Sequence, residues 1–476
     1  MNYQPTIGLE VHAQLLSKSK LFCAASTRFG EEPNANVHPL CMAMPGTLPK
    51  LNAAVVDMAI RTGLALQCTI NLESRWDRKH YFYPDLPSGF QVTQNELPIC
   101  EHGTLSVSTT EGERPIRIRR IHMEEDAGKL MHDPQSAESL VDLNRAGIPL
   151  LEIVSAPDIH TAEEAAAYLR SLRDILVYIG VSDGNLEEGS FRSDANVSIA
   201  PKGSTTLGTR VEIKNINSFR FVQKAIEYEI ARQVSVLENG GKLVQETRLW
   251  DAEKGETRSM RSKENAQDYR YFPEPNLPPL RIEASQVEAL KKTLPELPKE
   301  KYRRYIESLG LPAYDAAVLT AERELAEYFE GCLTHYADAK KLSNWVMGEL
   351  LRMSKEEEIA FSALRFSKEQ FARLLQAVDA GKISLNAAKE VFAHMFRTGE
   401  EPERIIEAKG LAQVSDVGAI EAAIAAVLEA HASETEKYRA GKKQVFGFLV
   451  GQVMKAMKGK GNPALVNQLL RNRLDN

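Results

Sequence analysis

The first 292 residues alternate between apolar and polar side chains over short runs, a period of two that is typical of half-buried β-strands. The clearest run is Ile7-Gly-Leu-Glu-Val-His-Ala-Gln14, in which every second residue is apolar or small. Turn-forming clusters such as Pro84-Asp-Leu-Pro-Ser-Gly89 separate these runs. The pattern predicts strands at Thr6–Gln14, Thr104–Ser108, Ile116–Met123, Asn196–Ile199 and Arg210–Lys214.

Start and stop signals predict two helices within the same region. Thr161-Ala-Glu-Glu164 has the form of a capping box, and Gly180 ends the helix that it opens. Ser218 opens a second helix, which has apolar side chains on one face and ends at Asn239-Gly-Gly241. Strands mixed with helices in this way predict an α+β domain.

The pattern changes after the Pro-rich stretch Phe272-Pro-Glu-Pro-Asn-Leu-Pro-Pro279, because the remaining residues have helical periodicity almost throughout. Ser367-Lys-Glu-Gln370 is another capping box within this half. A turn at Glu401-Pro402 and the short helix behind it divide the half again. We therefore predict three domains: an α+β domain at 1–293, an all-α helical domain at 294–408 and a small all-α tail domain at 409–476.

Composition is that of a globular protein, since 43% of the 476 residues are apolar and 26% are charged. The five cysteines are too few and too scattered for a disulfide scaffold. The sequence shows neither a signal peptide at its start nor a run of 18 apolar residues. These features predict a cytoplasmic protein that does not enter a membrane.

Charge is distributed unevenly along the chain. The net charge is −6, but residues 437–476 contain nine Lys or Arg and a single acid, Asp475. This basic tail indicates either an arm that meets an anionic polymer or a solvated helical face.

The first domain lacks the usual nucleotide-binding and hydrolase motifs, but it contains acids on alternating or turn-flanked segments, where they are either metal ligands or solvated surface groups. On a strand, Glu10 and His12 share one face, where they form either part of a cation site or an exposed polar surface. The run His122-Met-Glu-Glu-Asp-Ala-Gly-Lys129 and the acid Glu152 add oxygen ligands of the kind that Mg²⁺ prefers. Alternatively, Glu152 belongs to an ordinary structural ion-pair network.

Basic residues in the same domain are candidates for phosphate contacts: Arg78, Lys79, Lys129, Arg192 and Lys214. Gly189 and Ser190 add further oxyanion contacts, and Asp194 and Asn196 alternate onto one face. Scattered acids for a hard cation and scattered bases for phosphate fit the ATP-dependent activation of a carboxylate. A structural protein with salt-bridged turns is the alternative.

Nine stretches of the chain are similar to a known family, and several exceed ten residues: IGLEVHAQL, DRKHYFYPDLPSGFQVTQ, IHMEEDAGK, VDLNRAGIPLLEIVSAPDI, LEEGSFRSDANVSI, EIKNINSF, QETRLWD, DYRYFPEPNLPPL and VFGFLVGQVMKAMKGKGNP. The chain resembles, along its full length, the B subunits of the bacterial aspartyl/glutamyl-tRNA amidotransferase GatCAB. The resemblance implies a glutamine synthetase-like "cradle" kinase domain. It also implies a heterotrimer with two partners. One is an amidase, the A component of GatCAB, which releases ammonia from glutamine. The other is a small third protein, the C component.

In such an enzyme the side-chain carboxylate of misacylated Glu-tRNA(Gln) or Asp-tRNA(Asn) is phosphorylated by ATP, and channelled ammonia displaces the phosphate. The resemblance assigns a Mg²⁺ cluster to Glu10, His12, Glu125 and Glu152, with Glu124 as a second-site ligand. It implies catalytic roles for Glu125, Lys79 and Tyr81, and cofactor contacts for Arg192, Asp194, Lys214 and Lys129. The basic tail then becomes a contact surface for tRNA phosphates.

One departure from the family concerns zinc. Some members have a C-x-C and a later C-x-x-C, whereas this chain has Phe22-Cys-Ala-Ala25 and His38-Pro-Leu-Cys41. Three possible ligands remain, and a closed structural zinc site needs four. We therefore expect no zinc.

Two other functions remain open at this stage. The first is a non-catalytic tRNA-binding scaffold in which the acids are structural. The second is a free-standing carboxylate–amine ligase that needs no partner glutaminase.

Overall fold

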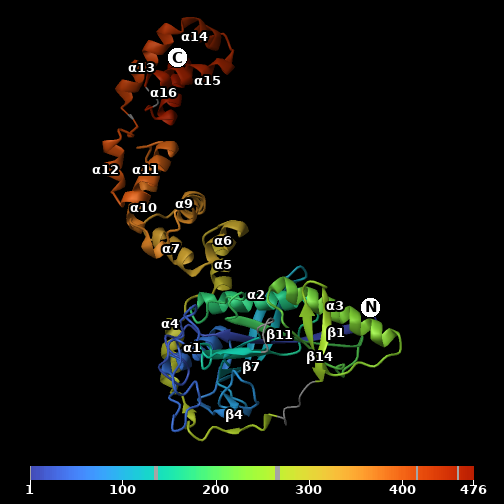
Figure 1. Cartoon of the computed structure of the whole chain (residues 1–476). Helices are drawn as coiled ribbons and strands as arrows, with labels where there is room; N and C mark the ends of the chain where they lie inside the picture. The colour runs from blue at the N-terminus through green and yellow to red at the C-terminus, as the bar shows by residue number, and fades with distance from the viewer. Residues whose placement is uncertain (1, 133–137, 263–268, 414–415, 458–459, 476) are drawn as a thin grey trace. The chain divides into compact units, whose positions relative to one another are not determined.

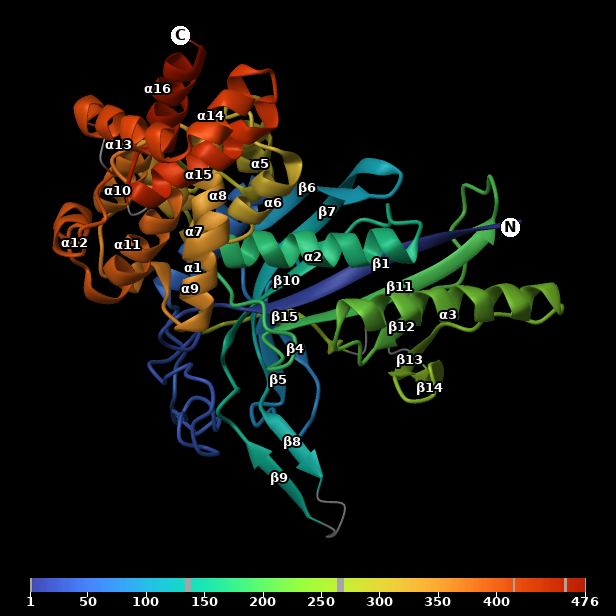
Figure 2. The same cartoon turned by 90° about the horizontal axis from the view of Figure 1, so that it is seen from above.

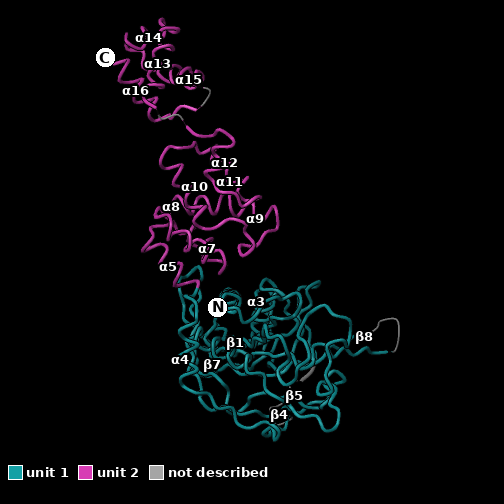
Figure 3. Tube along the Cα trace, turned by 90° about the vertical axis from the view of Figure 1, so that its left-hand side faces the viewer, with its two compact units in different colours: residues 1–297 teal, residues 298–476 magenta. Residues whose placement is uncertain are grey.

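The computed structural model describes residues 2–132, 138–262, 269–413, 416–457 and 460–475. The chain forms two compact units, residues 1–297 and residues 298–476, which Figure 3 shows in separate colours. The first unit ends four residues after the predicted boundary at 293.

A nine-stranded sheet forms the first unit, and its central strand is the first in the sequence. Two groups of strands flank β1 (Tyr3–Gln14). On one side are β10 (Pro149–Ser155), β7 (Gly112–Glu125), β6 (Cys100–Thr109) and β2 (Thr69–Ile70). On the other are β11 (Phe191–Pro201), β12 (Val211–Lys214), β13 (Glu246–Asp251) and β14 (Glu256–Ser262). Neighbouring strands are antiparallel, except for the parallel pair β12 and β13.

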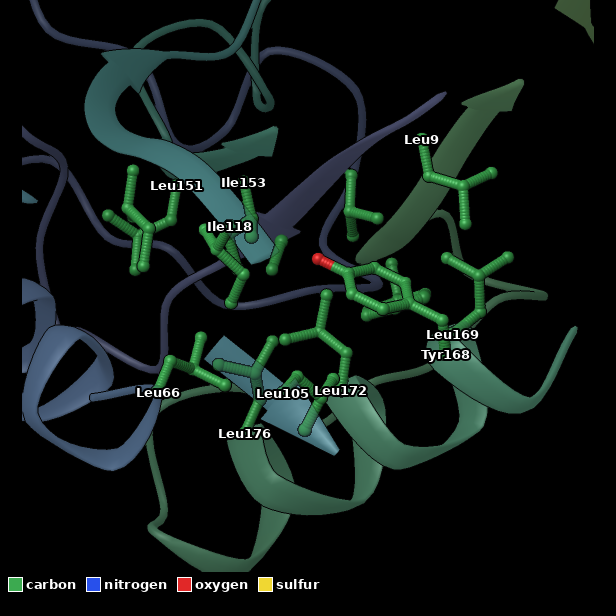
Figure 4. Packing of buried hydrophobic residues seen from close by; sticks show 14 of the residues in the cluster. Leu9, Leu66, Leu105, Ile118, Leu151, Ile153, Tyr168, Leu169, Leu172 and Leu176 are labelled. Atoms are coloured by element: carbon green, nitrogen blue, oxygen red, sulfur yellow. The ribbon is translucent and has the colours of Figure 1, made fainter. Parts of the chain in front are cut away.

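Helices α2 (Ala162–Tyr178) and α3 (Phe219–Glu238) pack against one face of this sheet (Figures 1 and 2). Leu9 of β1 and Ile153 of β10 point into the same buried cluster as Tyr168 and Leu172 of α2 (Figure 4). Burial of such apolar surface is the main stabilising term. Because strand side chains alternate, the polar residues of these strands point to the opposite face.

Smaller β elements complete the unit. Strand β4 (Asp77–His80) pairs with β5 (Phe90–Thr93) and β15 (Phe272–Pro273), and β8 (Lys129–His132) pairs with β9 (Ser139–Asp142). In Figures 1 and 3, β4 lies on the opposite side of the sheet from α3. The remaining elements are α1 (Ala53–Ala65), β3 (Glu73–Ser74), β16 (Leu280–Arg281) and α4 (Ala284–Thr293).

The described part of the second unit is helical and contains two separate clusters of buried side chains, on either side of residue 408. The first cluster is formed by α5 (Pro298–Glu307), α6 (Ala313–Thr320), α7 (Arg323–Leu333), α8 (Ala339–Trp345), the π-helical turn Val346–Leu350, α9 (Leu351–Glu356), α10 (Lys368–Asp379), α11 (Leu385–Thr398) and α12 (Pro402–Ala408). The second is formed by α13 (Val417–Ala430), α14 (Ala432–Arg439), α15 (Phe446–Ala456) and α16 (Pro463–Asp475).

Most local predictions are confirmed. All five predicted strands are present, Thr161 and Ser367 form capping boxes, and Ser218 caps α3. An α+β region followed by a helical region is therefore correct, while the likeness to glutamine synthetase and the three-domain division stay predictions. No helix among the described residues is long and apolar enough to cross a membrane.

Candidate active site

The polar face of the sheet brings together acids and histidines from three adjacent strands. His12 of β1 lies opposite Glu152 of β10, and Glu152 lies opposite His122 of β7. Antiparallel register places such side chains within reach of one another on one face. The site therefore depends on the pairing of strands that are far apart in the sequence.

His12, Glu124 and Glu152 form the centre of this cluster. His12 Nε2 lies 3.5 Å from Glu124 Oε1 and 3.3 Å from Glu152 Oε2. His122 Nε2 approaches the same two carboxylates at 3.7 and 3.5 Å. One ligand atom from each of His12, Glu124 and Glu152 lies within 4.8 Å of the others, and no other group of this kind occurs among the described residues.

Neighbouring charges control the ionisation of the cluster. Burial by itself lowers the pKa of His12, but the Glu152 and Glu124 carboxylates outweigh it and raise that pKa to about 9. Burial by itself raises the pKa of both glutamates, and the nearby histidines and Lys79 bring it below its ordinary value. In the absence of a cation, His12 thus carries a proton between two ionised carboxylates.

Glu10 lies in the same cavity, which has a volume of about 330 Å³. Its Oε1 accepts a hydrogen bond of 2.9 Å from Asn196 Nδ2, while Asn196 Oδ1 is buried without a described partner. Carboxylate oxygens with an imidazole nitrogen are a suitable ligand set for a divalent cation. His12, Glu124 and Glu152 therefore fit the predicted cation, whereas Glu10 borders the same cavity without belonging to this group.

Glu125 does not join this cluster, which corrects its placement among the metal ligands. Successive residues of β7 point to opposite faces, so Glu124 and Glu125 diverge. Glu125 Oε1 accepts a hydrogen bond of 3.1 Å from the Val92 backbone and lines a separate cavity of about 310 Å³. Burial raises the pKa of Glu125 to about 7.

Lys79 and Tyr81 line a cavity that His12 and Glu124 also border. Lys79 lines the cavity of His12, and its Nζ lies 5.0 Å from the ring centroid of Tyr269 and 5.9 Å from that of Tyr81. Burial by itself lowers the pKa of Lys79, but Glu124, Tyr271 and Glu152 raise it above its ordinary value. The ammonium group therefore stays charged at neutral pH.

The four residues predicted to contact a cofactor line connected cavities. Lys214 Nζ donates to Asp194 Oδ2 at 2.5 Å at the edge of the cluster. Arg192 Nη2 donates to Asp126 Oδ2 at 2.9 Å, and Arg192 and Asp194 also line a cavity of about 850 Å³ that Lys129 borders. Arg192 is thus oriented by Asp126.

Sequence reasoning missed His122, Asp126, Tyr269 and Tyr271, although signals for them were present. In His122-Met-Glu-Glu-Asp126 a period of two places the first, third and fifth residues on one face. Tyr269 and Tyr271 belong to the stretch DYRYFPEPNLPPL, which is similar to the family. Both tyrosines line the cavity of His12.

At the candidate zinc position, Cys23 Sγ lies 3.8 Å from Cys41 Sγ. His38 does not complete a group with them among the described residues, and its Nδ1 accepts a hydrogen bond from the Leu40 backbone. The absence of zinc remains a prediction.

In the described part of the basic tail, several charged groups lie against its own helices. Lys443 Nζ lies 3.0 Å from Asp475 Oδ1 and 3.9 Å from the ring centroid of Tyr438. Arg471 lies over the Phe446 ring. Lys458 lies outside the described residues.

Comparisons with known proteins agree with the resemblance. Residues 5–288 match the family model of the GatB/GatE catalytic domain, and residues 327–474 match that of the GatB domain. Proteins named as B subunits of aspartyl/glutamyl-tRNA(Asn/Gln) amidotransferases are similar over nearly their whole length. The protein of Myxococcus xanthus is 65% identical, with 99% of each chain covered. That of Geotalea uraniireducens is 57% identical, with 100% of each covered, and that of Anaeromyxobacter dehalogenans is 56% identical, with 99% of each covered.

These matches extend over both compact units and include the strands that carry the cluster. The chain belongs to the GatB family, the B subunits of aspartyl/glutamyl-tRNA amidotransferases.

Proposed function

We propose that this chain, as a GatB subunit, uses ATP and Mg²⁺ to phosphorylate the side-chain carboxylate of Glu-tRNA(Gln) or Asp-tRNA(Asn). Ammonia from a partner amidase then replaces the phosphate, giving Gln-tRNA(Gln) or Asn-tRNA(Asn). An ionised carboxylate has no good leaving group, and phosphorylation supplies one. The enzyme is accordingly a ligase that forms a C–N bond in the cytoplasm, as a heterotrimer with an amidase and a small third protein.

The observation that carries this proposal is the group of His12, Glu124 and Glu152, whose ligand atoms lie within 4.8 Å of one another. These residues and Glu10 would hold Mg²⁺. When bound, the cation would neutralise charge on phosphate oxygens. Lys79 and Lys214 border the same cavity and supply further positive charge.

The neighbouring cavities provide room for a large substrate. Arg192, fixed by Asp126, and Lys129 border the cavity of about 850 Å³, where they would contact phosphates of ATP or of the tRNA end. Tyr269 and Tyr271 line the same cavity as His12 and Lys79. We propose that these two tyrosines orient the reacting carboxylate of the substrate toward Lys79.

Glu125 has a different proposed role from that of a metal ligand. A carboxyl group with a pKa near 7 exchanges protons readily at physiological pH. Attack by ammonia on an acyl phosphate releases a proton, so a nearby proton acceptor assists the amidation. We therefore keep Glu125 as a catalytic residue for the ammonia step.

The experiment uses the chain assembled with its amidase and the small third protein, ATP labelled at the γ-phosphate, and misacylated tRNA. Ammonium chloride replaces glutamine in one arm, which separates the chemistry of this chain from that of the amidase. We expect release of labelled phosphate and formation of amidated tRNA, both lost in Glu152→Gln while tRNA binding is retained. Glu111→Gln, an exposed residue in the turn between β6 and β7, is the matched control.

Two outcomes would contradict the proposal. Wild-type phosphate release by Glu152→Gln would show that the cluster is structural. Amidated tRNA formation that needs neither ATP nor Mg²⁺ would show that the chain is a tRNA-binding scaffold. Separate assays with Glu-tRNA(Gln) and Asp-tRNA(Asn) determine which substrate is used.

A further inference from the structure

Lys20 is a fully buried lysine whose described polar contacts do not include a carboxylate. Its side chain has no exposed surface, and its Nζ lies 3.4 Å from Cys41 Sγ and 3.1 Å from the Leu143 carbonyl oxygen. A buried ammonium group is costly unless an anion or several acceptors compensate it. The Cys41 sulfur is placed to be that anion, as a thiolate.

Cys23 supplies the second sulfur. Its Sγ lies 3.8 Å from Cys41 Sγ, which is about van der Waals contact, and both side chains are only half-buried. The hydrogen bond from Cys23 and the charge of Lys20 lower the pKa of the Cys41 thiol to about 5. One proton is therefore held by Cys23, and Cys41 is the nucleophile of the pair.

The surrounding chain permits the small movement that a covalent bond requires. Neither cysteine lies in a regular helix or strand, and residues 28–35, which lie between them in the chain, are exposed. Both side chains line the cavity of about 310 Å³ that Glu125 also borders, so small solutes have a path to them. A disulfide needs the two sulfurs to approach from 3.8 Å to about 2 Å, and this movement is part of what we propose for the pair.

We propose that Cys23 and Cys41 form a redox-active dithiol that low-molecular-weight disulfides oxidise to an intrachain disulfide. This inference does not rest on the proposed function, because neither sulfur belongs to the His12 cluster, although both border the cavity of Glu125.

The reaction balances with a small disulfide such as oxidised glutathione as oxidant. The Cys41 thiolate attacks one sulfur of the oxidant, its S–S bond breaks, and one thiol leaves after taking a proton from solvent. Cys23 loses its proton and attacks the Cys41 sulfur of the mixed disulfide, which releases the second thiol. Two cysteine thiols are oxidised, and one oxidant disulfide is reduced to two thiols.

The other three cysteines differ and serve as internal controls. The Cys68 and Cys100 thiols donate to backbone carbonyl oxygens of Leu66 and Ala59, and burial raises the pKa of both. Cys332 is buried, and burial raises its pKa to about 12. These thiols are expected to react slowly in the folded chain.

The test incubates the reduced full-length chain with oxidised glutathione, quenches it with acid, blocks free thiols with a maleimide and maps the peptides by mass spectrometry. Cleavage after Arg28 separates the two cysteines, so a disulfide appears as linked peptides. We expect the Cys23–Cys41 link to form first, with the other three cysteines still free. No such link under conditions that oxidise the unfolded chain would overturn the proposal.

Three variants distinguish the roles of Cys23 and Lys20. Cys23→Ser is expected to stop at glutathione bound to Cys41, and Lys20→Gln to slow alkylation of Cys41 about tenfold near pH 6. Lys20→Arg retains the charge and should remain close to wild type, with thermal unfolding as the check on folding. The proposal would also be overturned if the pair bound zinc stoichiometrically and could be oxidised only after a chelator had removed the zinc.

Discussion

Glu124 and Glu125 are adjacent at the end of β7, yet they border different cavities. Glu124 meets His12 and His122 on the polar face of the sheet, and its pKa lies below its ordinary value. Glu125 borders the cavity of Lys20 and the cysteines, and its pKa rises to about 7. Glu124 is buried and Glu125 is half-buried, so the more deeply buried acid has the lower pKa and burial alone does not explain the difference.

The difference shows that neighbouring charge, more than depth, determines what a buried acid does. Two imidazoles and Lys79 keep Glu124 ionised, as a cation ligand must be. The main described partner of the Glu125 carboxylate is one backbone amide, which does not offset the cost of burial. Strand alternation thus places one of two identical side chains in the cluster proposed to bind a cation and the other in a separate cavity.

The largest effect is expected from the isosteric pair Glu124→Gln and Glu125→Gln. Glu124→Gln should lower ATP- and Mg²⁺-dependent phosphate transfer by more than about 100-fold. Mutation of a residue that only hydrogen-bonds to a metal ligand already lowers metal affinity or activity by roughly 10–100-fold. Glu125→Gln should reduce amidation more than phosphate transfer. Parallel assays of labelled phosphate and amidated tRNA measure both. If Glu125→Gln lowered phosphate transfer more than Glu124→Gln did, the proposed difference between the two glutamates would be wrong.

The pH dependence of cation binding is expected to be the next largest effect. Mg²⁺ must displace the proton of His12, whose pKa is about 9, so apparent affinity should rise roughly tenfold per unit between about pH 6 and 8. Calorimetric titration in buffers of different ionisation enthalpy measures the proton released. Binding that is independent of pH would show that His12 is not a ligand.

The same proton affects stability in the absence of a divalent cation. The folded pKa of His12 is raised from 6.5 to about 9, so its contribution is fully present below about pH 6.5 and is lost as pH rises through about 9. Wild type should therefore lose more thermal stability over this interval than His12→Asn. If wild type and His12→Asn lost the same thermal stability, the titrating proton would belong to a group other than His12.

Glu125 should affect stability over a different pH range. Its folded pKa is raised from 4.5 to about 7, so stability falls as pH rises through that interval. Glu125→Gln removes the unfavourable charge and should raise Tm by a few degrees near pH 8 but not near pH 4.5. Thermal unfolding at both pH values, with the exposed Glu111→Gln as control, tests this.

The smallest effect is expected from Thr93, whose Oγ1 donates to Glu124 Oε2 at 3.3 Å. Removing one such hydrogen bond in Thr93→Val should raise the Mg²⁺ concentration needed for half-maximal activity about fivefold, which corresponds to roughly 1 kcal/mol. Thr93→Ser retains the hydroxyl and should restore most of the affinity. Failure of serine to do so would indicate a packing role.

The sequence by itself determined most of the local structure. Alternation predicted β1, β7 and β11, and capping residues such as Thr161 and Ser367 marked helix starts, because both signals depend only on neighbouring residues. Resemblance along the full chain indicated the family and directed attention to Glu10, His12 and Glu152.

Only the tertiary structure decided which of these acids meet. His12 and Glu152 are 140 residues apart, and the register of β1 against β10 and β7 brings them together with His122. The same register separates Glu124 from Glu125, and loop packing places Lys20 against Cys41. Periodicity gives the face of a strand on which a side chain lies, whereas the neighbours across strands depend on long-range pairing that nearby residues do not encode.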